Sequence, residues 1–502
     1  MYTSLKFGIL IALSLLLTSC GEQTEPCADF ELICLREAKA KLEATPSKTV
    51  REGEQVKFDA SDSILDSINW KMDGESIDKC EDKLTCILAM TTIGTREIEI
   101  KTTVDEVGFS STTSDKTSVS ITVLEVSPTK AISAGSNHTC AVLEDTTVKC
   151  WGWNNYGQLG NGETTDDSTS VEVTGITNAS EISAGSNHTC ALLSDKTVHC
   201  WGRNTYGQLG NGETSDQTTF SVQVSGLSTA TQVSAGESHT CALLNGNTVQ
   251  CWGRGDSGQL GDGNATNETA PVTVSGISTA TQISVGNEFA CAVLSGGTVQ
   301  CWGQNTSGQL GNGNIVSQSS PVTVSGISTA TQVSVGYTHA CAVLSGGTMQ
   351  CWGTGSYGQL GNGSTSDQTS PVTVSGISNA SSISAGDYHN CALLSDDTMQ
   401  CWGRNNYGQL GNGDTSNLSI AAEISGSLSF TIELCPGITT QISPTSFDLG
   451  GSHSCLLLSD EIGRCWGKNS YGQLGNSSTE DQSTFVIVEE SWMELRNLDY
   501  LD

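Results

Sequence analysis

Residues 182–212 read ISAGSNHTCALLSDKTVHCWGRNTYGQLGNG, and close copies of this stretch recur along the chain. Each copy contains the tripeptide Cys-Trp-Gly. The seven cysteines that begin it are separated by 50, 51, 50, 50, 50 and 64 residues: Cys150, Cys200, Cys251, Cys301, Cys351, Cys401 and Cys465. Each copy has four segments typical of short β-strands, which correspond to ISAG, HTCALL, TVxCWG and a later PVTV-like piece. Four strands in each of seven repeats predict an all-β, seven-bladed β-propeller.

The repeat resembles the regulator of chromosome condensation repeat through HTCALL, a turn, TVxCWG and NxYGQLGNG. All seven copies carry the resemblance, which implies a propeller over residues 131–502 with four antiparallel strands in each blade. The last copy departs from the pattern, because it has an insertion at about 427–444 and Ser477 replaces the final glycine of GQLGNG. SWMELRN, at 491–497, resembles one more first strand, and we expect it to pair near residues 131–135 and close the ring.

Paired cysteines accompany every repeat, because a second cysteine lies ten residues before each Cys-Trp-Gly. The midpoint of each pair falls on a turn, such as Asp145 or Asp195, and mirror positions in an antiparallel hairpin lie about 4.5–5.5 Å apart. That separation suits a disulfide. Zinc is the alternative, but CxxC spacing is missing and each repeat holds only one pair. The predicted disulfides are Cys140–Cys150, Cys190–Cys200, Cys241–Cys251, Cys291–Cys301, Cys341–Cys351, Cys391–Cys401 and Cys455–Cys465, with Cys27–Cys34 and Cys80–Cys86 outside the repeats. Cys435 is left as a free thiol, an intermolecular bridge or a buried thiol.

The N-terminus has the pattern of an export signal, with Lys6 followed by an apolar run over residues 7–17. The run is too short to span a bilayer, which takes about 20 residues, and is typical of a signal peptide. Leu17-Thr18-Ser19-Cys20 resembles the lipobox of bacterial lipoproteins, which implies cleavage before Cys20 and its acylation, palmitate included. Gly21 in place of Asp then favours anchoring in the outer membrane, on either its periplasmic or its surface side. The alternative is an ordinary secretory signal. Twenty cysteines also fit an oxidising compartment.

The segment before the repeats has a different sequence pattern, in which apolar and polar residues alternate with a period of two. GEQVKFDASDS and INWKMDGES resemble the polycystic-kidney-disease-type immunoglobulin-like domain, so we expect a small β-sandwich with Trp70 in its core. The expected organisation is a lipoprotein signal peptide at 1–19, a lipidated tether at 20–44, the immunoglobulin-like β-sandwich at 45–126 and the propeller at 131–502.

Charge gives the first indication of a binding face. The chain has 54 acidic and 22 basic residues, and its net charge of −32 argues against nucleic acid as a partner. Four of the few basic residues in the propeller directly follow Trp-Gly. This position, at one strand end and so at one face, holds Trp153, Arg203, Arg254, Gln304, Thr354, Arg404 and Lys468. Cations with one exposed tryptophan have the composition of an interface hot spot, although the repeat could simply tolerate long polar side chains here.

Catalytic and metal-binding patterns do not stand out. Six histidines lie two residues before the first cysteine of a repeat, but Phe289 takes this place in the fourth copy, which favours a structural role. Arg254-Gly255-Asp256-Ser257 spells an integrin-binding tetrapeptide and overlaps a GDSG serine-protease motif, both at a position where other repeats have RNTYG. We therefore expect no catalytic residues, no metal and no cofactor.

The leading hypothesis is a monomeric, non-enzymatic protein, anchored in the cell envelope through its lipid, that presents one propeller face to a protein or glycan. The resemblance suggests alternatives, because nuclear members of the family promote guanine-nucleotide exchange on a small GTPase and a secreted bacterial relative inhibits β-lactamases. An export signal argues against a cytosolic GTPase. A lyase or hydrolase acting in the channel is a third class, for which the sequence shows no convergent acid–base set.

Overall fold

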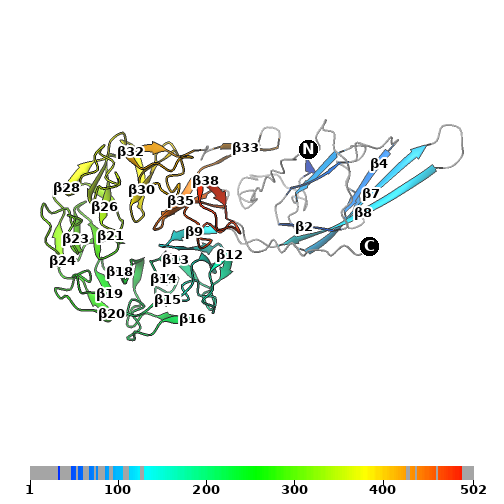
Figure 1. Cartoon of the computed structure of the whole chain (residues 1–502). Helices are drawn as coiled ribbons and strands as arrows, with labels where there is room; N and C mark the ends of the chain where they lie inside the picture. The colour runs from blue at the N-terminus through cyan, green and yellow to red at the C-terminus, as the bar shows by residue number, and fades with distance from the viewer. Residues whose placement is uncertain are drawn as a thin grey trace. The chain divides into compact units, whose positions relative to one another are not determined.

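A computed structural model describes residues 129–425, 443–459 and 462–488, together with the backbone of the strands in 32–124 and 430–442 (Figure 1). The chain divides into two units, one of residues 1–128 and 433–439 and the other of 129–432 and 440–502. Each is described by itself. The predicted signal peptide, Cys20 and the disulfide Cys27–Cys34 lie outside the described residues. No described segment forms a helix that could cross a membrane.

The first unit consists of strands in two sheets. A five-stranded sheet has the order β2-β8-β7-β4-β5, in which β2 and β8 are parallel, and a three-stranded sheet has the order β1-β6-β3. The strands are β1 (Leu32–Ile33), β2 (Ser47–Arg51), β3 (Gln55–Asp59), β4 (Ser67–Met72), β5 (Glu75–Ser76), β6 (Thr85–Ala89), β7 (Gly94–Asp105) and β8 (Thr112–Leu124). The β-sandwich and the disulfide Cys80–Cys86 stay predictions, because the side chains involved lie outside the described residues.

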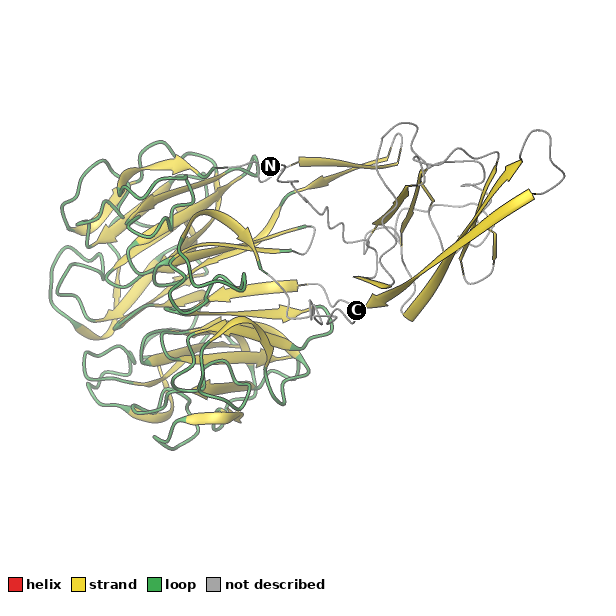
Figure 2. Ribbon diagram, turned by 45° about the vertical axis from the view of Figure 1, so that its right-hand side comes forward, coloured by secondary structure: helices red, strands yellow, loops and turns green. Residues whose placement is uncertain are grey.

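The second unit is a ring of seven four-stranded antiparallel sheets, which confirms the seven-bladed propeller (Figures 1 and 2). We number the blades 1 to 7 in chain order. The first strands surround the channel and are β9 (Thr129–Ala134), β13 (Ala179–Ala184), β17 (Ala230–Ala235), β21 (Ala280–Val285), β25 (Ala330–Val335), β29 (Ala380–Ala385) and β35 (Pro444–Leu449). The second strands are β10 (His138–Leu143), β14 (His188–Leu193), β18 (His239–Leu244), β22 (Phe289–Leu294), β26 (His339–Leu344), β30 (His389–Leu394) and β36 (His453–Leu458).

The outer half of each blade is formed by its third and fourth strands. The third strands are β11 (Val148–Gly152), β15 (Val198–Gly202), β19 (Val249–Gly253), β23 (Val299–Gly303), β27 (Met349–Gly353), β31 (Met399–Gly403) and β37 (Gly463–Gly467). The fourth strands are β12 (Asp167–Glu172), β16 (Gln217–Gln223), β20 (Glu268–Thr273), β24 (Gln318–Thr323), β28 (Gln368–Thr373), β32 (Leu418–Glu423) and β38 (Gln482–Ile487). In the insertion, β33 (Phe430–Cys435) pairs with β34 (Ile438–Ile442).

The register of the central hairpin brings the cysteine pairs together. Cys140 lies directly opposite Cys150 in β10 and β11, and the same register recurs in the other blades. All seven pairs form disulfides with Cα–Cα distances of 4.0–4.1 Å, as predicted for the repeats. The side chain of Cys435 lies outside the described residues. Seven disulfides indicate an oxidising, non-cytoplasmic environment.

Neighbouring blades are joined by a buried tryptophan. The Trp201 indole N–H of blade 2 donates to the Gln158 carbonyl of blade 1 at 2.9 Å, and each of the other six tryptophans makes the equivalent bond. Gly160 lies against this ring, with a φ of +67°, and a Cβ there would come within 2.8 Å of the indole nitrogen. The glycine of GQLG is therefore required both by its backbone conformation and by the close approach of the next blade.

The histidines join the same blade junctions. His138 Nε2 lies 2.9 Å from the Thr189 hydroxyl of the next blade, and that hydroxyl donates to the Gln158 carbonyl. The histidine must therefore donate, as a neutral ring. Burial lowers the pKa of His138 to about 3, so it stays uncharged at neutral pH. In blade 4 Phe289 is fully buried at this position, which confirms the structural interpretation.

Around the channel, side chains of the first strands accept hydrogen bonds from backbone N–H groups of the next blade. The Ser133 hydroxyl accepts the Ala184 N–H of blade 2, and five further serines repeat this bond. In blade 7 Asp448 takes the serine's place. Its carboxylate accepts from Ser384 of blade 6 at 2.9 Å and from the Ala134 N–H of blade 1 at 2.9 Å. The ring is therefore closed through Asp448. The pairing predicted for 491–497 lies outside the described residues.

Candidate functional site

The residues that follow Trp-Gly all lie at one end of the blades. Trp153 follows β11, and its N–H donates to the Asn137 carbonyl, just before β10, at 2.9 Å. The same bond forms in the other six blades. Each third strand therefore ends beside the loop that leaves the first strand, and the seven predicted binding positions share one face with the mouth of the channel.

A tyrosine three residues further on completes this ring. We call the two sets of side chains the crown: Trp153, Arg203, Arg254, Gln304, Thr354, Arg404 and Lys468, with Tyr156, Tyr206, Ser257, Ser307, Tyr357, Tyr407 and Tyr471. The sequence interpretation overlooked the second set, although the Tyr of NxYGQLG was visible in five repeats.

At four blade junctions of the crown a cation lies against an aromatic ring. The Arg203 guanidinium lies 5.0 Å from the centre of the Tyr156 ring in the preceding blade, within the range of a cation–π interaction. Arg254 lies over Tyr206 at 5.5 Å, Arg404 over Tyr357 at 5.2 Å and Lys468 over Tyr407 at 5.8 Å, again in the preceding blades. The cations are therefore held in place across the blade junctions.

Trp153 is not exposed as the sequence suggested. It is half-buried, edge-on to Tyr156 with ring centres 5.6 Å apart and tilted against Tyr471 of blade 7 at 5.9 Å. The reason is that the tyrosine position flanks Trp153 on both sides, with Tyr156 in its own blade and Tyr471 in blade 7. Trp153 presents one part of a packed aromatic cluster at the surface.

The crown changes character where two serines replace tyrosine. Glu288, just before β22, accepts hydrogen bonds from Arg254, from the Ser257 hydroxyl at 3.1 Å and from the Gln304 amide at 2.7 Å. Arg254 also pairs with Asp256 at 2.9 Å. Arg254 is thus neutralised within the molecule, and the charged side chains of the Arg-Gly-Asp tripeptide bind each other.

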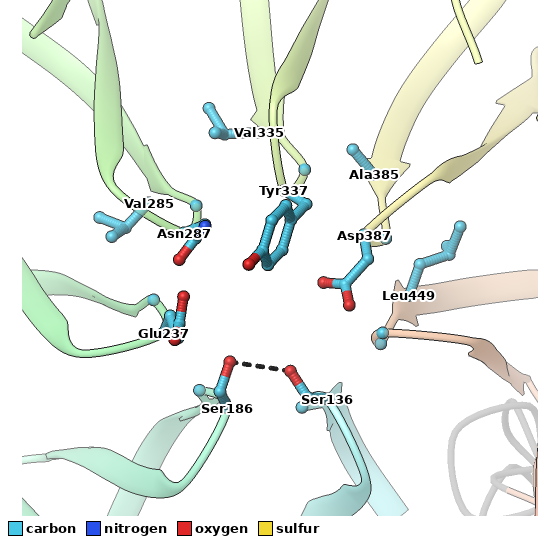
Figure 3. Close-up of a pocket in the computed structure, with 18 of the residues that line it drawn as sticks. Ser136, Ser186, Glu237, Val285, Asn287, Val335, Tyr337, Ala385, Asp387 and Leu449 are labelled. Carbon is cyan, nitrogen blue, oxygen red and sulfur yellow. Dashed lines mark hydrogen bonds between the residues drawn. The ribbon is translucent and has the colours of Figure 1, made fainter. Parts of the chain in front are cut away.

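Inside the crown, the mouth of the channel forms a cavity of about 80 Å³ (Figure 3). Every blade contributes three consecutive residues that follow or end its first strand. We call the third residue of each set the mouth position: Ser136, Ser186, Glu237, Asn287, Tyr337, Asp387 and Gly451. Figure 3 shows the side chains of Glu237, Asn287, Tyr337 and Asp387 directed into the cavity, while Val285 points away.

In four blades the mouth position is held by a backbone hydrogen bond to a glycine carbonyl of the next blade. The N–H of Ser136 donates to the Gly185 carbonyl of the next blade at 3.3 Å, and Glu237 repeats the bond to Gly286 at 3.2 Å. The side chains of Ser136 and Ser186 contact each other at 2.8 Å. Nothing in the single sequence marked these residues, because six different residue types occupy seven equivalent positions.

Family membership follows from comparison with known proteins. A profile described as the RCC1-like domain matches residues 80–336, about half of the chain. The chain belongs to the RCC1-like domain family. Profiles of the single regulator of chromosome condensation repeat match residues 330–359, 380–409 and 347–393.

Solved structures show the same fold at low sequence identity. Human WBSCR16 is 21% identical to this chain and has a TM-score of 0.59. The match covers 68% of this chain and 89% of WBSCR16. Prp20p from Saccharomyces cerevisiae is 18% identical and also has a TM-score of 0.59. This match covers 73% of this chain and 88% of Prp20p. The ultraviolet-B receptor UVR8 of Arabidopsis thaliana is 54% identical over 39 residues, which is 8% of this chain and 9% of the receptor.

The mouth of this RCC1-like propeller concentrates negative charge. Burial, and then the nearby charge of Glu237, raise the pKa of Asp387 to about 6, while Arg404 and Lys468 act against the rise. Burial and Glu288 likewise raise the pKa of Glu237. Neither carboxylate has a hydrogen bond or ion pair with any described residue. The sequence indicated no converging titratable groups, and the structure corrects this, because ring closure joins residues 150 positions apart.

Chemically, the mouth offers acceptors in a confined space. Two carboxylates and the Asn287 amide line a cavity far smaller than the roughly 300–1,000 Å³ of pockets that enclose drug-sized ligands. Within the described parts of the chain no cluster of three or more His, Cys, Asp or Glu could hold a metal ion. The arrangement suits recognition of one small polar group.

Proposed function

We propose that this RCC1-like protein is a non-enzymatic binding protein of the cell envelope, anchored through an acylated Cys20, and that it presents the crown and the channel mouth to a protein partner. The observation that carries the proposal is the crown itself. Trp153, four cations and five tyrosines gather at one end of the propeller, around a polar depression. Tryptophan, tyrosine and arginine are the residue types that dominate protein interface hot spots.

Preorganisation supports the same proposal. Crown side chains such as Arg203 and Trp153 are half-buried and held by neighbouring rings before any partner binds. Immobilising a flexible side chain on binding costs about 0.5–1.5 kcal/mol, and here part of that cost is met in the folded protein. Tyrosine and tryptophan side chains supply large, rigid contact areas at a low cost in conformational entropy.

A nucleotide-exchange role is the second candidate, because Prp20p shares the fold and its structure is described with binding to Gsp1p and histones. The seven disulfides favour an oxidising compartment, where a cytosolic GTPase would not be met. Binding in the envelope is therefore the better supported function, and inhibition of an envelope or secreted enzyme is one form that it could take.

Site-specific photo-crosslinking in intact cells tests the proposal. A photoreactive residue at Thr354, in the crown, should give one defined protein adduct, while the same residue at Asp396, in the exposed turn at the far end of β30, should not. Adding Arg404→Ser should weaken the Thr354 adduct. Equal adducts from both positions, or none from the crown, would contradict the proposal. Labelled palmitate that is lost in Cys20→Ala tests the anchor separately.

A further inference from the structure

The channel mouth contains a buried amide oxygen that has no hydrogen-bond partner among the described residues. Asn287 is 9% exposed and lines the cavity, and its amide oxygen has no hydrogen bond within the described part of the protein. Figure 3 shows this side chain among those directed into the cavity. A buried acceptor without a donor costs about 1–3 kcal/mol, so a ligand that supplies a donor here is favoured.

Two carboxylates share the cavity with this amide. Glu237 and Asp387 approach from blades 3 and 6 and have no paired cation among the described residues. The neighbouring cations make their own contacts, since Arg254 is bound by Glu288 and Arg404 lies over three tyrosine rings. All three groups present oxygen acceptors. Burial and the charge of Glu237 raise the pKa of Asp387 although Arg404 and Lys468 act against the rise, so these cations offset only part of the cost of its negative charge.

We propose that the channel mouth is a receptor for one ammonium or guanidinium group, supplied by a lysine or arginine side chain of the protein partner, with Glu237, Asn287 and Asp387 as its acceptors. This inference rests on the proposed function. An ammonium has three donors and no acceptor, which matches an amide oxygen and two carboxylates. A cavity of about 80 Å³ admits the end of one such side chain but does not enclose a drug-sized ligand.

An aromatic ridge indicates that the cation belongs to a side chain. Tyr337 at the mouth packs against Tyr388 with ring centres 5.4 Å apart, and Tyr388 packs against Tyr357 of the crown at 5.3 Å. The ridge thus leads from the cavity to the crown. The methylenes of a lysine or arginine lie well along such a surface while the charged group reaches the acceptors.

Small probes test the cavity without knowledge of the partner. The thermal unfolding of the full chain is followed at low salt and pH 8 with added N-acetyl-lysine methylamide, with its neutral isostere N-acetyl-norleucine methylamide and with n-butylammonium. We expect the lysine derivative to raise Tm in a saturable way at millimolar concentration, and the norleucine derivative to leave Tm unchanged. A saturable shift from n-butylammonium alone would overturn the assignment to a side chain.

Variants assign the effect to the mouth. Asp387→Asn and Glu237→Gln should each abolish the shift, whereas Asp396→Asn, which removes an equal charge at the opposite end of blade 6, should keep it. Because Asp387 has no partner to lose, its variant should fold normally, and its own unfolding curve checks this. A shift that survives in Asp387→Asn would show non-specific attraction to an acidic protein and overturn the proposal. The result is independent of crosslinking at Thr354, which tests whether a protein partner exists.

Discussion

The blade junctions and the channel mouth are both formed by equivalent positions of the seven blades, but the side chains are repeated at the junctions and varied at the mouth. At the junctions Trp201 and its six equivalents make the same hydrogen bond, and the histidines next to them are buried and neutral. At the mouth a backbone bond to the next blade recurs in four of the seven blades while the side chain changes from blade to blade, with the carboxylates of Glu237 and Asp387 unpaired. A repeated side chain in this fold indicates structure, and a varied side chain on a repeated backbone indicates recognition.

The largest effect should come from the junctions. Trp352→Ala removes a fully buried ring and its bond to the Gln309 carbonyl, and we expect it to lower the free energy of unfolding by about 3–5 kcal/mol. Tyr357→Ala, in the half-buried crown of the same blade, is the matched control and should lose far less. Chemical denaturation measures both. Equal losses of stability in the two variants would show that the crown contributes to folding as much as the blade junctions do.

Next in size is the loss of a blade's disulfide. The double variant Cys291→Ala, Cys301→Ala opens a bridge between residues ten apart in blade 4, and we expect a loss of at most about 2–3 kcal/mol. Non-reduced peptide mapping should first show the seven linked pairs in the wild-type chain. A bridge between blades, or a zinc ion held by these cysteines, would contradict the pairing.

At the mouth, removal of a charge should stabilise the protein. The folded-state pKa of Asp387, about 6, lies above its usual 3.8, so its ionised form destabilises the folded state as the pH rises through this range. Asp387→Asn should therefore gain about 1–2 kcal/mol above pH 7 and nothing near pH 3.5. Unfolding curves across this pH range measure the gain, and a uniform loss of stability would mean that the carboxylate has a structural partner.

The smallest effect on stability should come from the crown. Arg203→Ser, Arg404→Ser and Lys468→Ser together should lower the free energy of unfolding by only about 1–1.5 kcal/mol, because a substitution at a solvated surface rarely costs more than about 0.5 kcal/mol. Arg203 loses one cation–π contact, Lys468 two and Arg404 three. Binding of the crosslinked partner should fall at least tenfold. Arg254→Ser is a separate comparison, since it leaves Glu288 without its cation. Unchanged binding by the triple variant would mean that the crown cations are tolerated and not used.

Repetition explains which features could be predicted from the sequence. Seven copies of Cys-Trp-Gly indicated the blades, and the ten-residue spacing placed Cys140 opposite Cys150, because local register follows from local spacing. The position of Arg203 at a common face followed for the same reason. The mouth could not be predicted, because Glu237 and Asp387 meet only when the ring closes. The stacking of Trp153 on the preceding blade was likewise a consequence of closure.

The backbone bond at the mouth position separates the shape of the protein from its selectivity. Since the N–H groups of Ser136, Ser186 and Glu237 are held by carbonyls of the next blade whatever side chains these residues carry, the three positions can be exchanged singly while the scaffold stays intact. The same propeller could then be retargeted, with acidic residues selecting basic side chains, basic residues selecting acidic ones and tyrosines selecting apolar ones. The repeated blades keep the scaffold constant, and substitutions at the mouth positions can change which partner the protein binds.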